Sequence, residues 1–509
     1  MASTGVWNRR GSRRPPSRSR WVIVSICAAA LAVPTLALGA AKKKRPSYED
    51  LERRVRELEE IVRTRLPPPP PGGVPAAPAA EAKPPVPPSE IEKIVDERLK
   101  KQKVLAGWKD GFFLESPDND FKLRVGGFLQ ADSHFFPTET GGTGTDSFTI
   151  RRARPILEGT VGKYFGFMVK PDFGQGKTVL KDAFVELKYW PELRFKAGKY
   201  KDPLSLERLE PAEKLLFVER SVANNLTPDR DIGVEILGDL WNGALSYQGG
   251  VFNGNLDGAD NDGAVGSDKS GVTRVFVQPF RNEPWPYLQK LGIGVGGMFG
   301  NRDKVDTSGL AYKTGGRETF FQFKKNVVND GFQTRVAPQG YYFWGPFSLM
   351  GEYIRTDQPS ALTVPPKKTP GKPTVPGMFF QDDVSNRGWL VQTSYVLTGD
   401  DAAYDGVQPR NPFDPRAGRW GAVEVAYRYS ELNIDPTVYT SGLADRTMTA
   451  GSATEHTFAV NWYFNKYVKL MLDYEHTGFD QAAPFTSTTF GGKKRTHEDA
   501  ILSRVQLQF

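Results

Sequence analysis

The sequence predicts an all-β fold: a 16-stranded antiparallel β-barrel that crosses a membrane, with a short N-terminal helical coiled-coil appendage. Three observations predict it. Apolar and polar side chains alternate with a period of two over stretches of about 15 residues, roughly twice the usual strand length. Short aromatic-rich turns alternate with long polar, glycine-rich segments. After residue 41, no apolar run approaches the length of about 18 residues that a membrane-spanning helix needs.

Residues 1–40 are predicted to be a secretory signal peptide. Six arginines between residues 9 and 20 precede an apolar run from Trp21 to Leu38, and small residues follow at 39–41. This order of a basic, an apolar and a small-residue segment is typical of a cleaved export signal. The alternative is an uncleaved membrane anchor, because the run has about the minimum length of a span. Pro34 within the run favours cleavage.

Cysteine content and charge exclude several classes of protein. The chain has one cysteine, Cys27, which excludes a disulfide framework and a cysteine-ligated zinc site. The formal net charge is +8, but residues 1–106 carry 21 of the 67 basic residues and only 11 of the 59 acidic ones. The positive excess therefore lies in the N-terminal tail, and we expect no nucleic acid as a partner.

Residues 42–106 are predicted to form an appendage in three parts. In 42–66, apolar residues at heptad spacing predict a short coiled coil: Leu51, Val55, Leu58 and Val62. Residues 67–88 are rich in proline and alanine and predict a stiff extended linker. In 89–106, Ser89 and Glu92 have the spacing of a capping box at the start of a short helix. The alternative for the appendage is a solvated charged tail.

Residues 107–509 are predicted to form the barrel. Alternation is clearest in 121–135, and again in 497–509, where the chain ends at Phe509 within an alternating strand. Eight long polar segments imply eight hairpins, hence 16 strands, which are enough to enclose an aqueous channel. The expected strands are 120–135, 147–161, 165–173, 181–190, 193–200, 230–240, 242–252, 272–281, 289–300, 332–344, 346–357, 385–398, 419–431, 455–464, 467–477 and 497–509. With the export signal and the aromatic turns, this pattern predicts the outer membrane.

Basic residues of the strands and of the third long segment, 201–229, are candidates to line the channel and bind anions. Arg151 and Arg152 are adjacent, and an arginine in the lipid mid-plane of a barrel costs about 2–4 kcal/mol. At least one of them must therefore escape the lipid by a bulge, by a position near the interface, or by reaching round a neighbour. The full set is Arg151, Arg152, Arg154, Arg194, Lys196, Arg208, Lys214, Arg220 and Arg230. The alternative is that these charged side chains only make the lumen hydrophilic and are neutralised in pairs by acidic side chains.

Several stretches resemble the phosphate-selective porin O and P family. They are residues 148–154 (FTIRRAR) with Gly159, 197–207 (AGKYKDPLSLE), 217–221 (FVERS), and 397–400 (LTGD) with 421–429. The resemblance implies a trimeric outer-membrane porin of a Gram-negative-type bacterium, with the appendage in the periplasm. It implies passive diffusion of small anions such as phosphate past an inward-folded third loop, with Arg151 and Arg152 at the family's paired arginines. Phe128 departs from the pattern, because a basic residue is common there in the family.

Two other functions remain open: a general non-selective porin, and a structural barrel that ties the outer membrane to the cell wall through residues 42–106. An enzyme is not expected. The stretch 174–178 (GQGKT) resembles a phosphate-binding loop, but Pro171 stands where its first glycine is required. The four histidines are far apart in sequence and no serine nucleophile motif is present. We therefore expect neither a cofactor nor a metal site.

Overall fold

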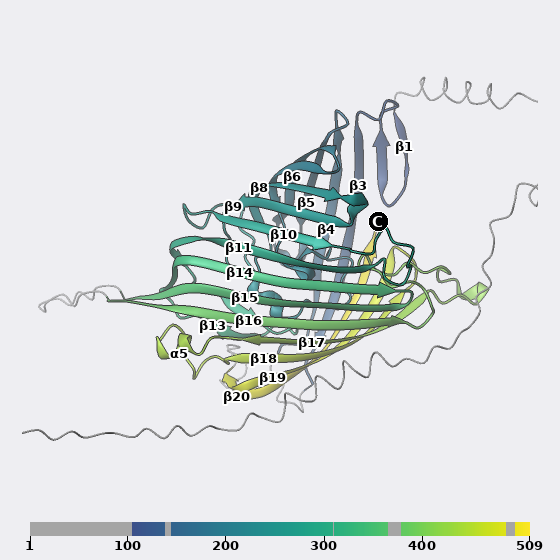
Figure 1. The fold of residues 1–509 in the computed structure, drawn as a ribbon. Helices are drawn as coiled ribbons and strands as arrows, with labels where there is room; N and C mark the ends of the chain where they lie inside the picture. Colours follow the sequence, from purple (N-terminus) through teal and green to yellow (C-terminus); the bar gives the residue numbers. More distant parts are fainter. Residues whose placement is uncertain (1–103, 138–143, 309, 365–377, 485–493) are drawn as a thin grey trace, which may run out of the picture. The chain divides into compact units, whose positions relative to one another are not determined.

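Sixteen antiparallel strands form a closed barrel in the computed structural model, which describes residues 104–137, 144–308, 310–364, 378–484 and 494–509 (Figure 1). Each strand pairs with the next, and β20 pairs with β3 to close the ring. The strands are β3 (Lys122–Phe135), β4 (Ser147–Val161), β5 (Phe165–Asp172), β6 (Val179–Trp190), β7 (Leu193–Tyr200), β8 (Asp231–Leu240), β9 (Leu245–Phe252), β10 (Ser270–Val277), β11 (Leu291–Asp306), β14 (Val327–Trp344), β15 (Phe347–Val364), β16 (Met378–Val396), β17 (Ala422–Asn433), β18 (Ser452–Tyr463), β19 (Val468–Pro484) and β20 (Lys494–Gln508). The predicted 16-stranded antiparallel barrel is confirmed, whereas the predicted coiled-coil appendage lies outside the described residues.

The N-terminal predictions fall almost entirely outside the described residues. This holds for the signal peptide (1–40), the coiled coil (42–66) and the linker (67–88). Of the predicted helix at 89–106, only the last three residues are described, and there strand β1 (Leu105–Trp108) begins instead. A hairpin of β1 and β2 (Phe112–Glu115) adds to the edge of β3, a feature that the sequence did not predict.

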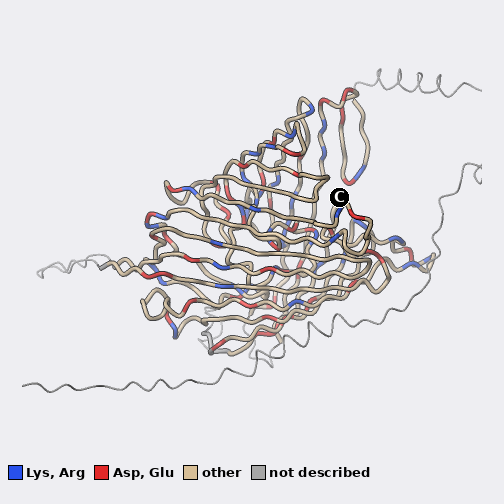
Figure 2. The backbone as a smooth tube through the Cα atoms, in the orientation of Figure 1, with Lys and Arg blue, Asp and Glu red and all other residues tan. Residues whose placement is uncertain are grey.

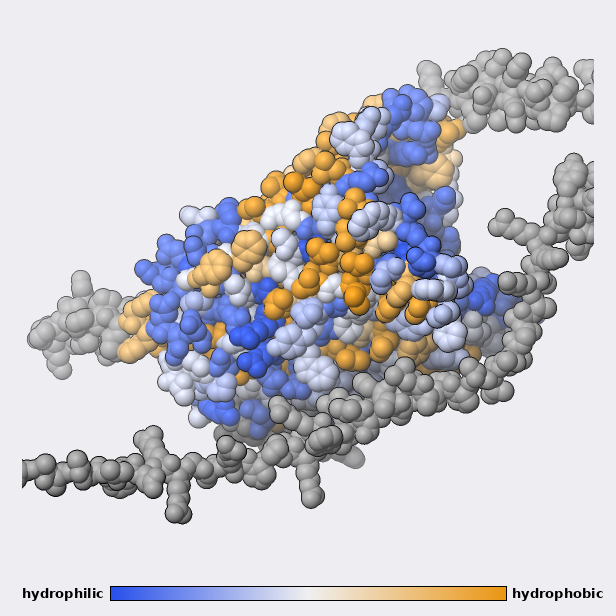
Figure 3. Space-filling view, in the orientation of Figure 1, coloured by the Kyte–Doolittle hydropathy of each residue, from blue (hydrophilic) through white to orange (hydrophobic). Residues whose placement is uncertain are grey.

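Alternation along each strand separates a lipid-facing from a lumen-facing surface. On β19, Leu470, Leu472 and Tyr474 are exposed, whereas Lys469 and Asp473 are buried. Acidic and basic residues are interspersed along the barrel (Figure 2), and apolar residues cover much of its outer wall between hydrophilic ends (Figure 3). Exposed tryptophans stand at the short turns: Trp190, Trp241, Trp285, Trp344 and Trp420. This is the aromatic girdle expected at a membrane interface.

The long loops carry an apolar core of their own. Leu226 of the third loop packs in one cluster with Phe320 and Phe321 of the fifth loop and Leu443 of the seventh, against the inward-facing Ile354 of β15. In the fifth loop, β12 (Ala311–Lys313) and β13 (Thr319–Gln322) form a small hairpin. Two helices of four residues, α4 (Leu206–Leu209) and α5 (Thr437–Thr440), lie in the third and seventh loops. Among the described residues, no helix has the length and apolar character needed to cross a membrane.

Candidate functional site

The third loop, 201–229, is bound to inward-facing side chains of several strands. Six of its backbone carbonyls accept hydrogen bonds from side chains of the wall. Four of these donors are Gln130 Nε2 to Ala212 O (3.0 Å), Lys469 Nζ to Leu215 O (3.0 Å), Asn461 Nδ2 to Leu216 O (2.8 Å) and Arg428 Nη1 to Glu219 O (2.9 Å). Because these donors come from β3, β17, β18 and β19, the loop lies against the inner wall.

A second anchor lies at the start of helix α4. The carboxyl group of Glu352 on β15 accepts from Ser205 Oγ at 3.0 Å, Leu206 N at 2.9 Å and Glu207 N at 3.1 Å. Leu206 N and Glu207 N are first-turn N–H groups without a partner in the helix, and a negative group is favourable there. The long turn between β16 and β17 also reaches this helix, since Tyr404 Oη donates to Leu206 O at 2.7 Å.

A β-bulge brings two adjacent arginines to the lumen. In the pairing of β3 with β4, Arg152 lies opposite Gln130 and Ile150 opposite Ala131, so Arg151 is the extra residue. An extra residue of this kind breaks the alternation of side chains. Arg151 and Arg152 both face inward, while Ile150 is 48% exposed on the outer side. Of the three predicted ways in which Arg151 or Arg152 could avoid the lipid, the structure shows the bulge.

The two arginines meet a carboxylate of the third loop, Glu219. Arg151 makes a forked contact with it, Nε to Oε1 at 2.6 Å and Nη2 to Oε2 at 3.1 Å. Arg152 Nη2 lies 3.8 Å from Oε2, and Arg504 Nη2 lies 3.6 Å from Oε1. Burial alone would raise the pKa of Glu219, but attraction to Arg151 and Arg152 outweighs it and holds the pKa well below its usual range.

Arg151, Arg152 and Glu219 line a cavity of about 200 Å³ between the third loop and the wall, here called the basic cavity. Its charged lining is dominated by cations. They are Arg151, Arg152, Arg154, Lys181, Lys201, Arg208, Arg220, Arg230, Lys313 and Arg317, against the two carboxylates Glu219 and Asp229. Because acidic and basic residues are interspersed elsewhere (Figure 2), the excess is local.

Part of this charge is neutralised. Arg154 Nε lies 2.7 Å from Asp172 Oδ2, and Asp229 lies within salt-bridge distance of Lys181 (2.9 Å) and Arg230 (2.5 Å).

Other cations of the cavity meet uncharged groups. Arg220 donates to Glu210 O at 2.6 Å and to Glu207 O at 3.0 Å, and Lys201 donates to Glu210 O at 2.7 Å. Burial and the neighbouring Arg208 lower the pKa of Arg220 to about 10, so it remains charged at neutral pH. Burial and the nearby Arg220 and Arg230 lower the pKa of Lys201 well below its usual value, so the arginines of the lining account for the positive field of the basic cavity.

Residues 121–509 match the family model described as phosphate-selective porin O and P. The chain belongs to this family. A curated relative, Porin O of Pseudomonas aeruginosa, is 24% identical over 407 residues, which are 72% of this chain and 85% of the relative. The protein is therefore an outer-membrane porin, a channel and not an enzyme.

Two solved structures are similar to this porin at low sequence identity. The anion-selective porin from Comamonas acidovorans is 11% identical, with 76% of this chain and 100% of that chain covered and a TM-score of 0.47. The outer membrane channel DcaP of Acinetobacter baumannii is 12% identical, with 80% and 100% covered and a TM-score of 0.48.

Six of the nine basic residues singled out in the sequence line the basic cavity of this porin, and three lie elsewhere. Arg194 faces inward as expected but pairs with Glu186 at 3.2 Å and Asp239 at 2.7 Å. Lys196 also faces inward, with Nζ 3.1 Å from Glu235 Oε1.

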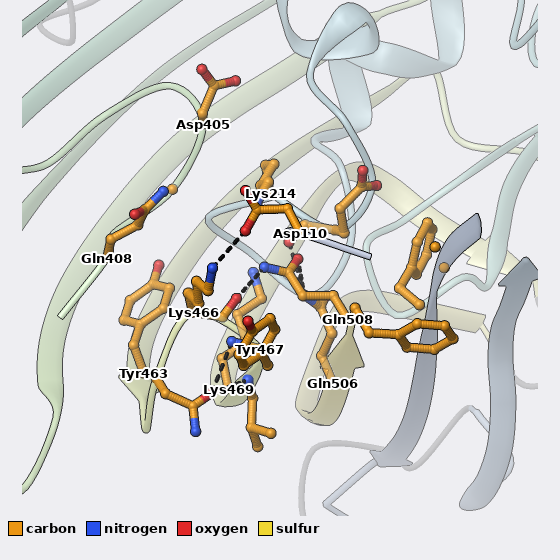
Figure 4. Close-up of a pocket in the computed structure, with 18 of the residues that line it drawn as sticks. Asp110, Lys214, Asp405, Gln408, Tyr463, Lys466, Tyr467, Lys469, Gln506 and Gln508 are labelled. Carbon is orange, nitrogen blue, oxygen red and sulfur yellow. Dashed lines mark hydrogen bonds and ion pairs between the residues drawn. The ribbon is translucent and has the colours of Figure 1, made fainter. Parts of the chain in front are cut away.

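The remaining residue, Lys214, lines a second cavity of about 620 Å³ near the short turns. There it shares the space with Lys466, Asp405 and Gln508 (Figure 4). Amides and charges of both signs line this second cavity.

Four cations that line the basic cavity were not predicted from the sequence as candidate residues. Lys181 is the extra residue of β6 where its pairing with β5 shifts register, and Lys201 follows β7. Lys313 and Arg317 belong to the fifth loop, at the β12–β13 hairpin, and no strand periodicity extends there. Within the described residues, no group of three or more His, Cys, Asp or Glu side chains has an arrangement that holds a metal ion.

Proposed function

We propose that this porin lets small anions, phosphate or a similar oxyanion, diffuse passively through a water-filled channel that the third loop narrows at the basic cavity. The observation that carries the proposal is the lining of this cavity, where ten basic side chains face two carboxylates. Walls of low dielectric focus the field of such a cluster and concentrate ions of opposite sign.

The chemistry of the lining favours oxyanions. A guanidinium group presents a rigid fork of donors that matches two oxygens of a phosphate or carboxylate, and Arg151 already makes such a forked contact with Glu219. A cavity of about 200 Å³ has room for a small oxyanion and a few waters, because each water occupies about 30 Å³.

A general non-selective porin is the second candidate. The observation in its favour is the pairing of charges outside the basic cavity, as at Arg194 and Lys196. Residues 107–509 also carry 46 basic and 48 acidic side chains, so the domain as a whole has no positive excess. Ion selectivity depends on the field at the narrowest point, which is why we prefer the anion-selective function.

We further propose that the porin is a homotrimer with residues 42–106 in the periplasm. A coiled coil as short as the predicted one is marginal alone, and three barrels held together would raise its effective concentration. Deletion of 42–103 tests this assignment together with the cell-wall tether. If the protein acts only as a porin, the deletion should leave its conductance unchanged. If residues 42–106 tie the outer membrane to the cell wall, the deletion should make the cell envelope less stable.

Substitution of one cavity arginine tests the proposed selectivity. In planar bilayers, added phosphate should block the chloride current of the wild type. In R152Q the phosphate concentration for half-block should rise about tenfold, because a charge about 4–6 Å from the anion is lost. R194Q, which removes a charge already paired with two carboxylates, should change it much less. Equal effects of the two substitutions, or no block of the wild type, would contradict the proposal.

A further inference from the structure

Glu219 occupies a position suited to a bound oxyanion. Its two carboxylate oxygens face the fork of Arg151 at 2.6 and 3.1 Å, with Arg152 and Arg504 at 3.8 and 3.6 Å. Arg504 is already paired with Asp132 by a forked contact at 2.8 and 2.7 Å. Within the part of the chain that the structure describes, Arg152 has only the neutral Gln130 Oε1 at 2.7 Å as a hydrogen-bond acceptor. The single negative charge of Glu219 thus lies close to three arginines, whose combined positive charge exceeds it.

We propose that Glu219 is a tethered resident anion. A permeating oxyanion must displace its carboxylate from Arg151, or share Arg151 and Arg152 with it, in order to pass. The inference rests on the proposed anion channel and deepens it, because it assigns a residue that sets which anions bind and how tightly.

The backbone around Glu219 allows this exchange without movement of the third loop. The carbonyl of Glu219 accepts from Arg428 Nη1 at 2.9 Å. On one side, Val218 N donates to Asp473 Oδ2 at 2.7 Å, and on the other, Ser221 N donates to Glu207 Oε1 at 2.8 Å. These bonds hold the loop by its main chain, so the carboxylate can rotate away from Arg151 while the loop stays in place.

Competition with a resident carboxylate favours multivalent oxyanions. Chloride is a single atom with one charge, so it cannot offer the two acceptor atoms that the forked contact of Arg151 uses. A phosphate dianion carries more charge and can bridge two arginines at once. The resident anion also limits how tightly a solute binds, and a channel conducts only if its ligands leave readily.

The test compares two neutralising substitutions in the same loop. E219Q removes the resident charge but keeps a side chain of the same size that can accept from Arg151. E213Q removes an equal charge from Glu213, which lines the second cavity. In planar bilayers at low salt, phosphate should half-block the chloride current of E219Q at a concentration about tenfold lower than for the wild type. E213Q should resemble the wild type, and so should E219D, which keeps the charge.

Salt separates an electrostatic role from a structural one. In about 1 M KCl the Debye length is about 3 Å, so the difference between E219Q and the wild type should become smaller, although these buried contacts are screened less than exposed ones. A difference of unchanged size, equal for all anions, would indicate a loosened loop and overturn the inference. Equal half-block concentrations in E219Q and E213Q, with the wild type still blocked by phosphate, would overturn it while leaving the proposed channel intact. Absence of block in the wild type as well would instead contradict the proposed function.

Discussion

Arg151 and Arg152 are neighbours in the chain, yet both guanidinium groups approach the same carboxylate, at 2.6 and 3.8 Å. In a regular strand one of them would face lipid. The bulge on β4 removes this cost and doubles the positive charge that one strand directs at the third loop. Two adjacent arginines in a predicted strand were therefore informative. In a regular strand one of them would face lipid, so their adjacency indicated an irregularity such as a bulge.

Glu210 in the third loop predicts a pH dependence of selectivity. Burial raises its pKa to about 8, even though Arg220 is nearby. Below that pH the side chain is neutral, and above it a negative charge appears in the third loop, which repels anions. The anion preference in KCl, measured as reversal potential, should therefore fall as pH rises from about 6.5 to about 9.5. E210Q should remove the part of this fall that is centred near pH 8, and an unchanged profile in E210Q would refute the assignment.

At the scale of elements, helix α4 owes its position to one side chain of the barrel wall. Glu352 satisfies Ser205 Oγ and the N–H groups of Leu206 and Glu207, at distances of 2.9 to 3.1 Å. The helix has four residues and would not persist alone. The third loop thus depends on the wall for its shape.

Loss of this anchor should destabilise the loop. E352A leaves three buried donors without an acceptor, each at a cost of about 1–3 kcal/mol. We expect a lower guanidinium unfolding midpoint and faster tryptic cleavage at the third loop, with a smaller effect in E352Q, whose amide oxygen still accepts. If E352A has the same midpoint and cleavage rate as the wild type, the anchor is not needed.

The elements also show which features a sequence reveals. The 16 strands were predictable because lipid-facing and lumen-facing side chains alternate with a period of two along most of them, although the bulge on β4 interrupts this alternation. The β12–β13 hairpin and the apolar contacts of Phe320 and Phe321 were not, since loop residues have no such period and their partners are distant in sequence. For the same reason Arg317 and Lys313 were missed in the basic cavity, whereas Arg154 on β4 was found; Lys181 on β6 was missed although it lies on a strand.

At the scale of the whole molecule, the lumen has two chemically different regions. The apolar loop core contacts inward-facing residues such as Val272 of β10, Ile354 of β15 and Ala453 of β18. The basic cavity instead contacts β4 and β6. We infer that ions pass on the basic side, since the apolar side offers no groups that replace their hydration. This separation explains why the overall charge balance did not predict the local field.

The central claim is that the basic cavity makes this porin prefer anions. Its most direct test is the reversal potential of the refolded full-length protein in a planar bilayer under a KCl gradient. We predict a potential with the sign of the chloride equilibrium potential, and a smaller chloride current once phosphate is added. A potential near zero or on the potassium side would contradict the claim and leave a general diffusion porin.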